Sequence, residues 1–341
     1  MLALLVPVLL LELGMRGLVW SGRLPEAPAH ERTLETSWAD LHAAPPPDVL
    51  LAGDSIIERS LDPAILAEGL TTAAGRPVRA FNLGQAGASP AQTALLVDAL
   101  IAEGRLPPVV ILGVTPDLLA GQLADGDAAA LGSPFAQGLA GCGGRTDPVA
   151  IVDCLLGQVS VAWRWHGRPG RVAEALGGPA VPLPVTSLGR RADGFLTGSG
   201  TTDAALAAEL ERRARGRRVV EGATDEVIAV YRDLVGRIEA AGSRAVIVAF
   251  PYSPPFDDAI EARRPGSMAA RDAGLDRLAA ATGVDVLRIP RFGDWWSAAD
   301  AYDLRHLSTA GAAVLTRELL ARDDVRAALL AALPDGGSGG R

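Results

Sequence analysis

The chain has 341 residues, and 49% of them are hydrophobic, which is enough apolar material for one large domain with a sizeable core. The formal net charge is −8, and the sequence contains no lysine, so arginine supplies the basic side chains. No long basic run or basic–aromatic cluster occurs, which argues against a nucleic-acid partner.

Residues 1–22 are predicted to form a membrane anchor or signal segment. The apolar opening runs to Leu11, is interrupted by Glu12 and Arg16, and resumes as far as Trp20. A spanning helix requires about 20 apolar residues, and a signal peptide usually has a basic start and a small-residue cleavage site. Neither description fits completely, and the alternative is an amphipathic helix packed on the domain.

Two further segments are expected to lie outside the globular domain. Residues 23–47 are polar and contain several prolines, as a linker would, and residues 334–341 ("PDGGSGGR") are predicted to be disordered. The main domain then covers residues 48–333. An anchor followed by a linker predicts a single-pass protein of the cell membrane with this domain outside the cytoplasm, or alternatively a secreted protein.

Short apolar runs alternate with longer segments of helical periodicity along this domain. The runs predict five buried strands at residues 48–53, 77–84, 108–114, 244–250 and 284–289. The expected helices cover residues 63–70, 89–104, 225–242, 265–283 and 309–333. Such alternation predicts an α/β fold, a five-stranded parallel sheet between two helical layers. Right-handed crossovers favour the flavodoxin-like strand order 2-1-3-4-5.

Residues 120–222 interrupt the alternation between the third and fourth strands. The segment is far longer than a crossover needs, so we interpret it as an insertion beside the active face, either a lid or a partner surface. It contains both cysteines of the chain, Cys142 and Cys154. They could form a disulfide if the domain is exported, or Cys154 could be an apolar helix residue.

The stretch "GDSI", residues 53–56, ends the first predicted strand. One interpretation is structural, because Asp and Ser are good helix N-caps and Gly permits a tight turn. The other is catalytic: Ser55 is a nucleophile at the carboxyl end of a central strand, where open α/β sheets place their chemistry. Asp54 then orders the loop by hydrogen bonding.

His306 is the histidine with a plausible partner nearby. Asp303 precedes it by three residues in "DLRH", so the carboxylate can contact one imidazole nitrogen and leave the other free to face a serine. A helix cap at Asp303 or Ser308 is the structural alternative. The other histidines, His30, His42 and His166, have no such partner and are interpreted as surface or packing residues.

Three short motifs together resemble the SGNH/GDSL hydrolases. "GDSI" matches the block that carries the nucleophile, and "NLGQAG", residues 82–87, matches the block in which Gly87 is an oxyanion donor. "DLRH" matches the block in which Asp303 and His306 complete a triad with Ser55. The resemblance implies a flavodoxin-like fold, with Asp54 and Asn82 as supporting residues.

A further motif of the family, which is its third block in chain order, differs in this chain. The family pattern G-x-N-D places an asparagine at the oxyanion, whereas the corresponding stretch here is "GVTPD", residues 113–117. Thr115 could donate through its hydroxyl, but Pro116 has no donor. Losing one oxyanion donor typically costs a factor of about 10²–10³ in rate. We therefore expect slow turnover of small esters.

The resemblance implies an acyl-ester hydrolase or acyltransferase with a Ser–His–Asp triad. The apolar start and the altered third block are similar to the membrane-anchored subgroup that acylates cell-surface glycans, such as the alginate O-acetylation and teichoic-acid D-alanyl transfer proteins. No metal or organic cofactor is implied. The expected partners are an acylated glycan or small ester, and a membrane acyltransferase. A general secreted esterase and a non-catalytic scaffold are the alternatives.

Overall fold

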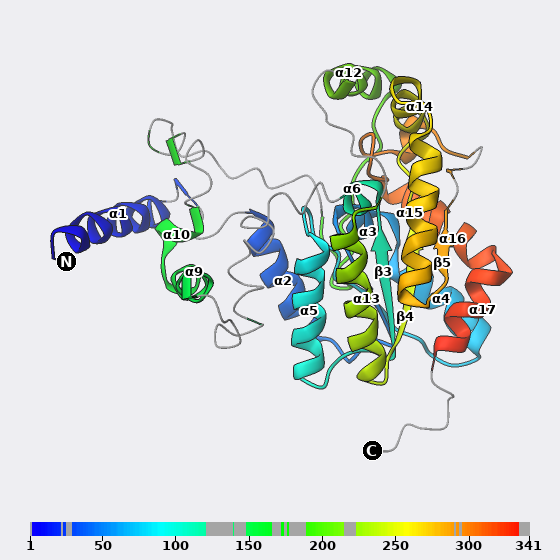
Figure 1. The fold of residues 1–341 in the computed structure, drawn as a ribbon, viewed down its shortest axis with the longest axis horizontal. Coiled ribbons are helices and arrows are strands. Elements are labelled where there is room, and N and C mark those ends of the chain that lie inside the picture. Colours follow the sequence, from blue (N-terminus) through cyan, green and yellow to red (C-terminus); the bar gives the residue numbers. More distant parts are fainter. Residues whose placement is uncertain are drawn as a thin grey trace.

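Five parallel strands form one sheet with helices on both faces in the computed structural model of the protein (Figure 1). The strand order is β2-β1-β3-β4-β5. The strands are β1 (Val49–Ala52), β2 (Ala80–Asn82), β3 (Val109–Val114), β4 (Arg244–Ala249) and β5 (Val286–Arg288). The predicted flavodoxin-like three-layer sandwich and its strand order are confirmed.

The structure describes residues 2–21, 23–24, 29–120, 139, 148–165, 172–173, 176, 189–214, 223–289, 291–292 and 295–333. The predicted disordered tail, Cys142 and His166 lie outside the described residues, as do the side chains of Cys154 and His30. The possible disulfide between the two cysteines therefore stays a prediction.

The two faces of the sheet are covered by two separate apolar clusters. Successive side chains of a strand point to opposite faces, so Leu50 and Val110 contribute to one cluster while Leu51 and Ile111 contribute to the other. Both clusters are fully or almost fully buried. The near-continuous apolar strands seen in the sequence thus follow from burial on both faces.

Each outer layer is made of helices whose ends carry clear sequence signals. The first layer contains α2 (Ala29–Ala43), α5 (Pro90–Ala102), α13 (Asp225–Ala240) and α15 (Ser267–Thr282). The second contains α3 (Ser55–Ser60), α4 (Pro63–Ala74), α16 (Thr309–Ala321) and α17 (Asp323–Ala332). Helices α4 and α5 begin with Pro after a capping Asp62 or Ser89, as helix N-termini prefer.

The structure corrects the prediction in two places. Residues 23–47 are not only a linker, because α2 lies within them and buries Leu34, Trp38 and Leu41 on the sheet domain. The helix predicted at residues 309–333 is two helices, since Arg322 takes an extended backbone conformation between α16 and α17. Helices α12 (Asp203–Ala214) and α14 (Pro254–Arg263) lie between the helices expected from the sequence.

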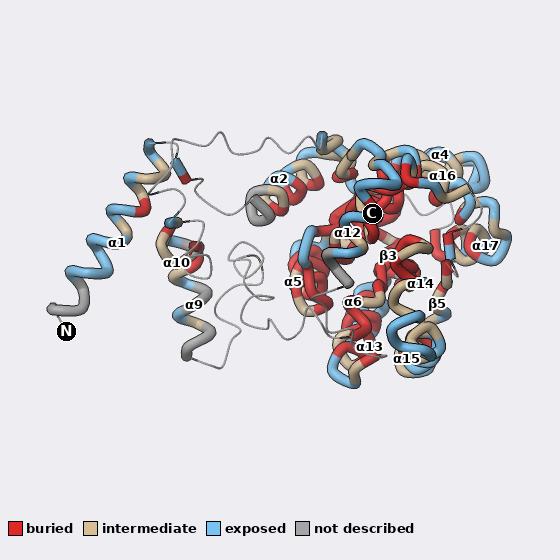
Figure 2. The backbone as a smooth tube through the Cα atoms, turned by 90° about the horizontal axis from the view of Figure 1, so that it is seen from above, coloured by how far each residue is buried: buried red, intermediate tan, exposed pale blue. Residues whose placement is uncertain are grey.

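The remaining described elements lie at the ends of the strands or away from the sheet. Short α6 (Pro116–Leu119) follows β3, and a 3-10 turn, η2 (Ala298–Asp300), precedes α16. Helices α1 (Leu2–Trp20), α9 (Pro148–Val159) and α10 (Val161–Trp165) form a group beside the sheet domain (Figures 1 and 2). Among the described residues, no helix combines the length and apolar character needed to cross a membrane.

The described end of the predicted insertion packs against the nucleophile side of the sheet. Arg190 and Leu196 form an antiparallel bridge, and the carbonyl of Asp193 accepts a hydrogen bond of 2.8 Å from the backbone N–H of Asn82 in β2. Farther along, the N–H of Gly198 donates to the Thr309 hydroxyl at the start of α16. Residues 189–201 therefore connect the outer edge of β2 to the loop before α16.

Candidate active site

The turn after β1 presents Ser55 as the first residue of α3. Gly53 ends the strand, and Asp54 is the N-cap, whose Oδ1 accepts a hydrogen bond of 2.9 Å from the N–H of Ile56. The capping interpretation is therefore correct for Asp54, and it leaves the Ser55 side chain unused by the helix. Capping and catalysis are compatible because different residues of the motif would perform them.

Glycines let α3 approach the strand ends closely. A Cβ atom added to Gly113 would lie 1.9 Å from Cγ1 of Ile57, and one added to Gly84 would lie 2.5 Å from the backbone N of Glu58. Both distances are far below van der Waals contact, so any side chain at these positions would push the helix outward. The position of Ser55 thus depends on small residues in β3 and in the loop after β2.

Ser55, His306 and Asp303 form a hydrogen-bonded chain. The Oγ of Ser55 lies 2.7 Å from Nε2 of His306. The Nδ1 of His306 lies 2.8 Å and 2.9 Å from the two carboxylate oxygens of Asp303. Since a carboxylate can only accept, Nδ1 carries the proton and Nε2 is left to accept from the serine hydroxyl. This is the orientation that a general base requires.

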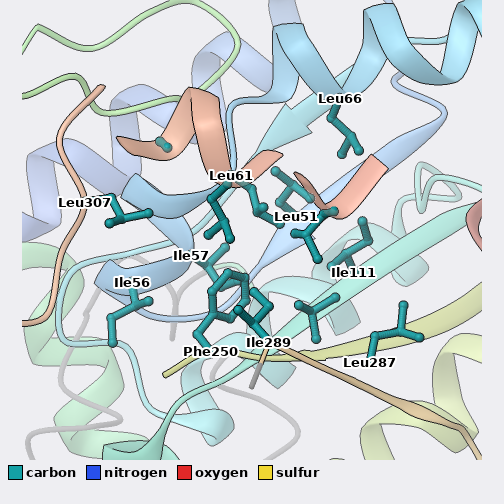
Figure 3. Close-up of a cluster of buried hydrophobic side chains, with 14 of the residues drawn as sticks. Leu51, Ile56, Ile57, Leu61, Leu66, Ile111, Phe250, Leu287, Ile289 and Leu307 are labelled. Atoms are coloured by element: carbon teal, nitrogen blue, oxygen red, sulfur yellow. The ribbon is translucent and has the colours of Figure 1, made fainter. Parts of the chain in front are cut away.

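The loop that carries His306 is held in a tight, closed conformation. Ala301 and Leu307 form an antiparallel bridge, and the N–H of Tyr302 donates to the carbonyl of His306 over 2.9 Å. Leu307 is buried in the same apolar cluster as Ile56 and Ile57 of α3 (Figure 3). The residues next to the base and those next to the nucleophile therefore share one core.

The environment of Asp303 favours its charged form. Burial alone would raise the pKa of Asp303, but the His306 ring and the backbone N–H groups of Arg305 and His306 outweigh it. Together they hold the pKa well below the usual range of a carboxyl group. Asp303 is consequently ionised at neutral pH and can stabilise the imidazolium that forms when His306 takes a proton.

The backbone N–H groups of Gly87 and Ser55 are the two donors expected to bind an oxyanion. Gly87 has a φ of 76°, a left-handed conformation that suits glycine, and it is exposed to solvent. Within the described part of the chain, neither the N–H of Gly87 nor that of Ser55, at the start of α3, has a hydrogen-bond acceptor. Unsatisfied N–H groups at a helix N-terminus attract negative charge.

Thr115 does not have a free hydroxyl proton for an oxyanion. Its Oγ1 donates to Oδ2 of Asp54 over 3.0 Å and accepts from the N–H of Leu118 as the N-cap of α6. The expected oxyanion role of Thr115 is therefore not supported by this geometry, because a hydroxyl has one proton and Asp54 receives it. Asp54 is buried, which raises its pKa against the opposing effect of these hydrogen bonds.

An ion pair that the sequence analysis missed joins the third block to the catalytic loop. Nη1 of Arg305 lies 2.7 Å from Oδ2 of Asp117, and their side chains are 22% and 8% exposed. Burial alone would lower the pKa of Arg305, but the charge and hydrogen bond of Asp117, together with the charges of Tyr252 and Asp303, outweigh it and raise the pKa. Both residues stand in motifs expected to meet at one end of the sheet, but the sequence does not single out this pair among its other acids and arginines.

A second set of charges lies beneath the nucleophile helix. Glu58 is fully buried and pairs with Arg190 at 2.9 Å, which brings the insertion into contact with α3. Arg59 places its guanidinium 4.3 Å from the ring centre of Tyr302, the neighbour of Asp303. Sequence reasoning could not find these contacts, because the partners are separated by more than 100 positions with no motif around them.

Asn82 has a structural role at this site. Its Nδ2 donates to the carbonyls of Ile57 and Leu61, and its Oδ1 accepts from the N–H of Gly84. The side chain thus links α3 to the loop that leads to Gly87, in agreement with the supporting role given to it. His42 lies elsewhere, between the carbonyl of Trp38 and the carboxylate of Glu103.

Within the described residues, no three His, Cys, Asp or Glu side chains are grouped so that they could hold a metal ion. A comparison with models of known protein families gave no match, and a comparison with curated protein sequences gave none either. The geometry of Ser55, His306 and Asp303 is therefore the observation from which a function must be argued.

Proposed function

We propose that this chain is a serine-dependent acyl-ester hydrolase or acyltransferase that acts on O-acyl groups of an extracellular glycan. The observation that carries the proposal is the hydrogen-bonded chain from Ser55 through His306 to Asp303. The resemblance of the surrounding motifs to SGNH/GDSL hydrolases supports the same reaction class. Two loops that are far apart in the sequence bring Ser55, His306 and Asp303 together in the order that a triad requires, which argues against a coincidental arrangement.

The reaction begins when Nε2 of His306 takes the proton from Ser55 as Oγ attacks the ester carbonyl. Asp303 keeps the ring in the tautomer that can accept this proton. We expect the N–H groups of Ser55 and Gly87 to bind the oxyanion of the tetrahedral intermediate. The imidazolium then gives its proton to the leaving alcohol, and an acyl-enzyme is left on Ser55.

The second half of the reaction returns the enzyme to its starting state. Water or a sugar hydroxyl loses its proton to His306 and attacks the acyl carbonyl, and Ser55 leaves with the proton from the imidazolium. Water gives hydrolysis and a sugar hydroxyl gives transfer. A membrane acyltransferase that supplies the acyl group belongs to the transfer version of the proposal.

The general secreted esterase is the second candidate, and turnover of small esters separates it from the first. With two backbone donors in place of three, a small ester held only at its carbonyl should react slowly. A larger glycan can recover that loss through contacts remote from the carbonyl. Turnover of p-nitrophenyl acetate at rates usual for efficient esterases would favour the general esterase.

The proposal is tested with a fluorophosphonate probe, which phosphonylates an activated serine and releases fluoride. We expect one adduct on the wild type, mapped by mass spectrometry to Ser55, and none on Ser55→Ala. The matched control is Ser267→Ala, because the Ser267 hydroxyl binds Glu261 at the surface of α15 and takes no part in the site. Equal labelling of the wild type and Ser55→Ala would refute the assignment.

A further inference from the structure

The exposed large apolar side chains of the described residues belong to one part of the molecule. They lie in α1, in α9 and at position 176, and the sheet domain contributes none of them. On α1 six such residues are 54% to 64% exposed, and on α9 three are 52% to 68% exposed: Val6, Val8, Leu9, Leu10, Leu11, Leu13, Val152, Leu155 and Val159. A soluble domain rarely exposes so much apolar surface without a use for it.

We propose that α1 and α9, joined through α10, form a single lipid-binding unit whose outer surface contacts the acyl chains of a bilayer. The insertion would then supply a membrane contact, in addition to its contacts with the sheet domain. This inference extends the expected anchor to a second segment far along the chain. It does not rest on the proposed chemistry of Ser55.

The distribution of the exposed residues identifies lipid as the occupant. Successive residues of an α-helix point about 100° apart, so the four consecutive residues from Val8 to Leu11 point to nearly all sides of α1. A partner helix or a second copy of the chain would cover a stripe along one face. Exposure on nearly all sides suits a medium that surrounds the helix, as hydrocarbon does.

Two charged side chains of α1, Glu12 and Arg16, bind groups of α9 and α10. Glu12, in the middle of α1, accepts hydrogen bonds from the Ser160 hydroxyl and from the backbone N–H groups of Val161 and Ala162 at the start of α10. Arg16 pairs with Glu12 and donates to the carbonyl of Val159 at the end of α9. The Glu12 carboxylate, 18% exposed, thereby finds its hydrogen-bond donors within the unit.

Polar groups in a low-dielectric environment need hydrogen-bond partners within the protein. In hydrocarbon each unsatisfied backbone N–H or C=O costs several kcal/mol, so helix ends there must find partners within the protein. The two charged residues that interrupt α1 are those that cap α10 and contact α9. Trp20, 79% exposed at the end of α1, has the amphipathic ring that is favoured where a membrane meets water.

The test measures flotation of the full-length protein with vesicles of a neutral phosphatidylcholine, reconstituted from detergent. We expect binding in 0.1 M NaCl and in 1 M NaCl alike, because apolar contact is not screened by salt. The double variant Val152→Glu/Leu155→Glu keeps α1 intact and should lower vesicle affinity at least tenfold. The control Ala204→Glu/Ala205→Glu adds the same charge to exposed positions of α12 and should leave affinity unchanged.

Two results would overturn the proposal. If the α9 variant floats as well as the wild type, α9 does not contact lipid and α1 acts without it. If the wild type fails to float and instead forms dimers or larger oligomers in sedimentation, a second copy covers the surface. The α9 variant should keep the urea unfolding midpoint of the wild type, which shows that the sheet domain is folded and keeps this test independent of the reactivity of Ser55.

Discussion

The ion pair between Asp117 and Arg305 should hold the catalytic loop in place. Arg305 is the neighbour of His306, and Asp117 lies in α6, whose N-cap Thr115 is bonded to Asp54. Replacing Asp117 by Asn keeps the shape of the side chain and removes its charge. We expect this change to loosen the loop and lower the reactivity of Ser55, although neither Asp117 nor Arg305 contacts the reacting atoms.

The size of the effect follows from the burial of the pair. Breaking a fully buried ion pair costs about 3–5 kcal/mol, whereas an exposed pair contributes about 0–1 kcal/mol. Arg305 retains 22% exposure and can regain some solvent, so we expect an intermediate loss of about 2 kcal/mol in unfolding free energy. If that energy holds the loop in its reactive position, reactivity falls at most about 30-fold.

Two measurements on the same variant separate a positioning role from a structural one. The first is the second-order rate of fluorophosphonate labelling at Ser55, and the second is unfolding by urea. A second variant, Arg305→Lys, should lose less of the labelling rate than Asp117→Asn, because an ammonium keeps the charge opposite Asp117 but loses the fixed geometry of the guanidinium. In the control Asp98→Asn, the broken pair with Arg237 is exposed and lies between α5 and α13, so both readouts should stay near wild type.

The idea would be refuted if Asp117→Asn lost stability while its labelling rate stayed equal to that of the wild type. The pair would then stabilise the fold without positioning His306. Unchanged stability and unchanged labelling would show that the pair contributes to neither.

Three further predictions follow from single contacts. Gly87→Ala should lower the free energy of unfolding by about 1–2 kcal/mol, because Gly87 has a φ of 76°. It should also slow acyl-enzyme formation in single-turnover kinetics, because the backbone N–H expected to bind the oxyanion would move. Asp303→Asn should lower kcat by about 10³–10⁴ with little change in KM, because His306 loses the carboxylate that fixes its tautomer. Burial, partly opposed by Arg271, raises the pKa of Asp257 to about 6. The folded state therefore holds this proton more tightly than the unfolded state, and the free energy of unfolding should fall by about 2 kcal/mol as pH rises from about 4 to about 6. Urea titrations of the wild type and Asp257→Asn across that range should show this loss in the wild type only.

The sheet could be predicted from the sequence because its strands are buried on both faces. Runs such as Val49–Ala52 and Val109–Val114 have no polar side chain, and in an α/β protein short runs of that kind are typical of central parallel strands. Helix α2 was missed because the prolines around it and its polar composition resemble a linker. Its three buried apolar residues pack against the sheet domain, and this contact is not visible in the local sequence pattern.

The candidate triad could be assembled from local motifs, while the contacts that position it could not. Asp303 and His306 are three residues apart, so their pairing is a short-range property of one loop. The pairs Glu58–Arg190 and Asp117–Arg305 join segments more than 100 positions apart. A charged residue has many possible partners at such a separation, because the sequence contains many acids and arginines. The fold determines which of them lie close together.

In the altered third block, the polar side chains bind the neighbours of Ser55 and His306. Thr115 gives its proton to Asp54, the residue before the nucleophile, and Asp117 two residues later binds Arg305, the residue before the base. Together with the bond between Ser55 and His306, these contacts close a ring that ties both reacting loops to α6. In this chain the block therefore contacts the neighbours of Ser55 and His306, and under the proposed mechanism the backbone N–H groups of Ser55 and Gly87 would stabilise the oxyanion.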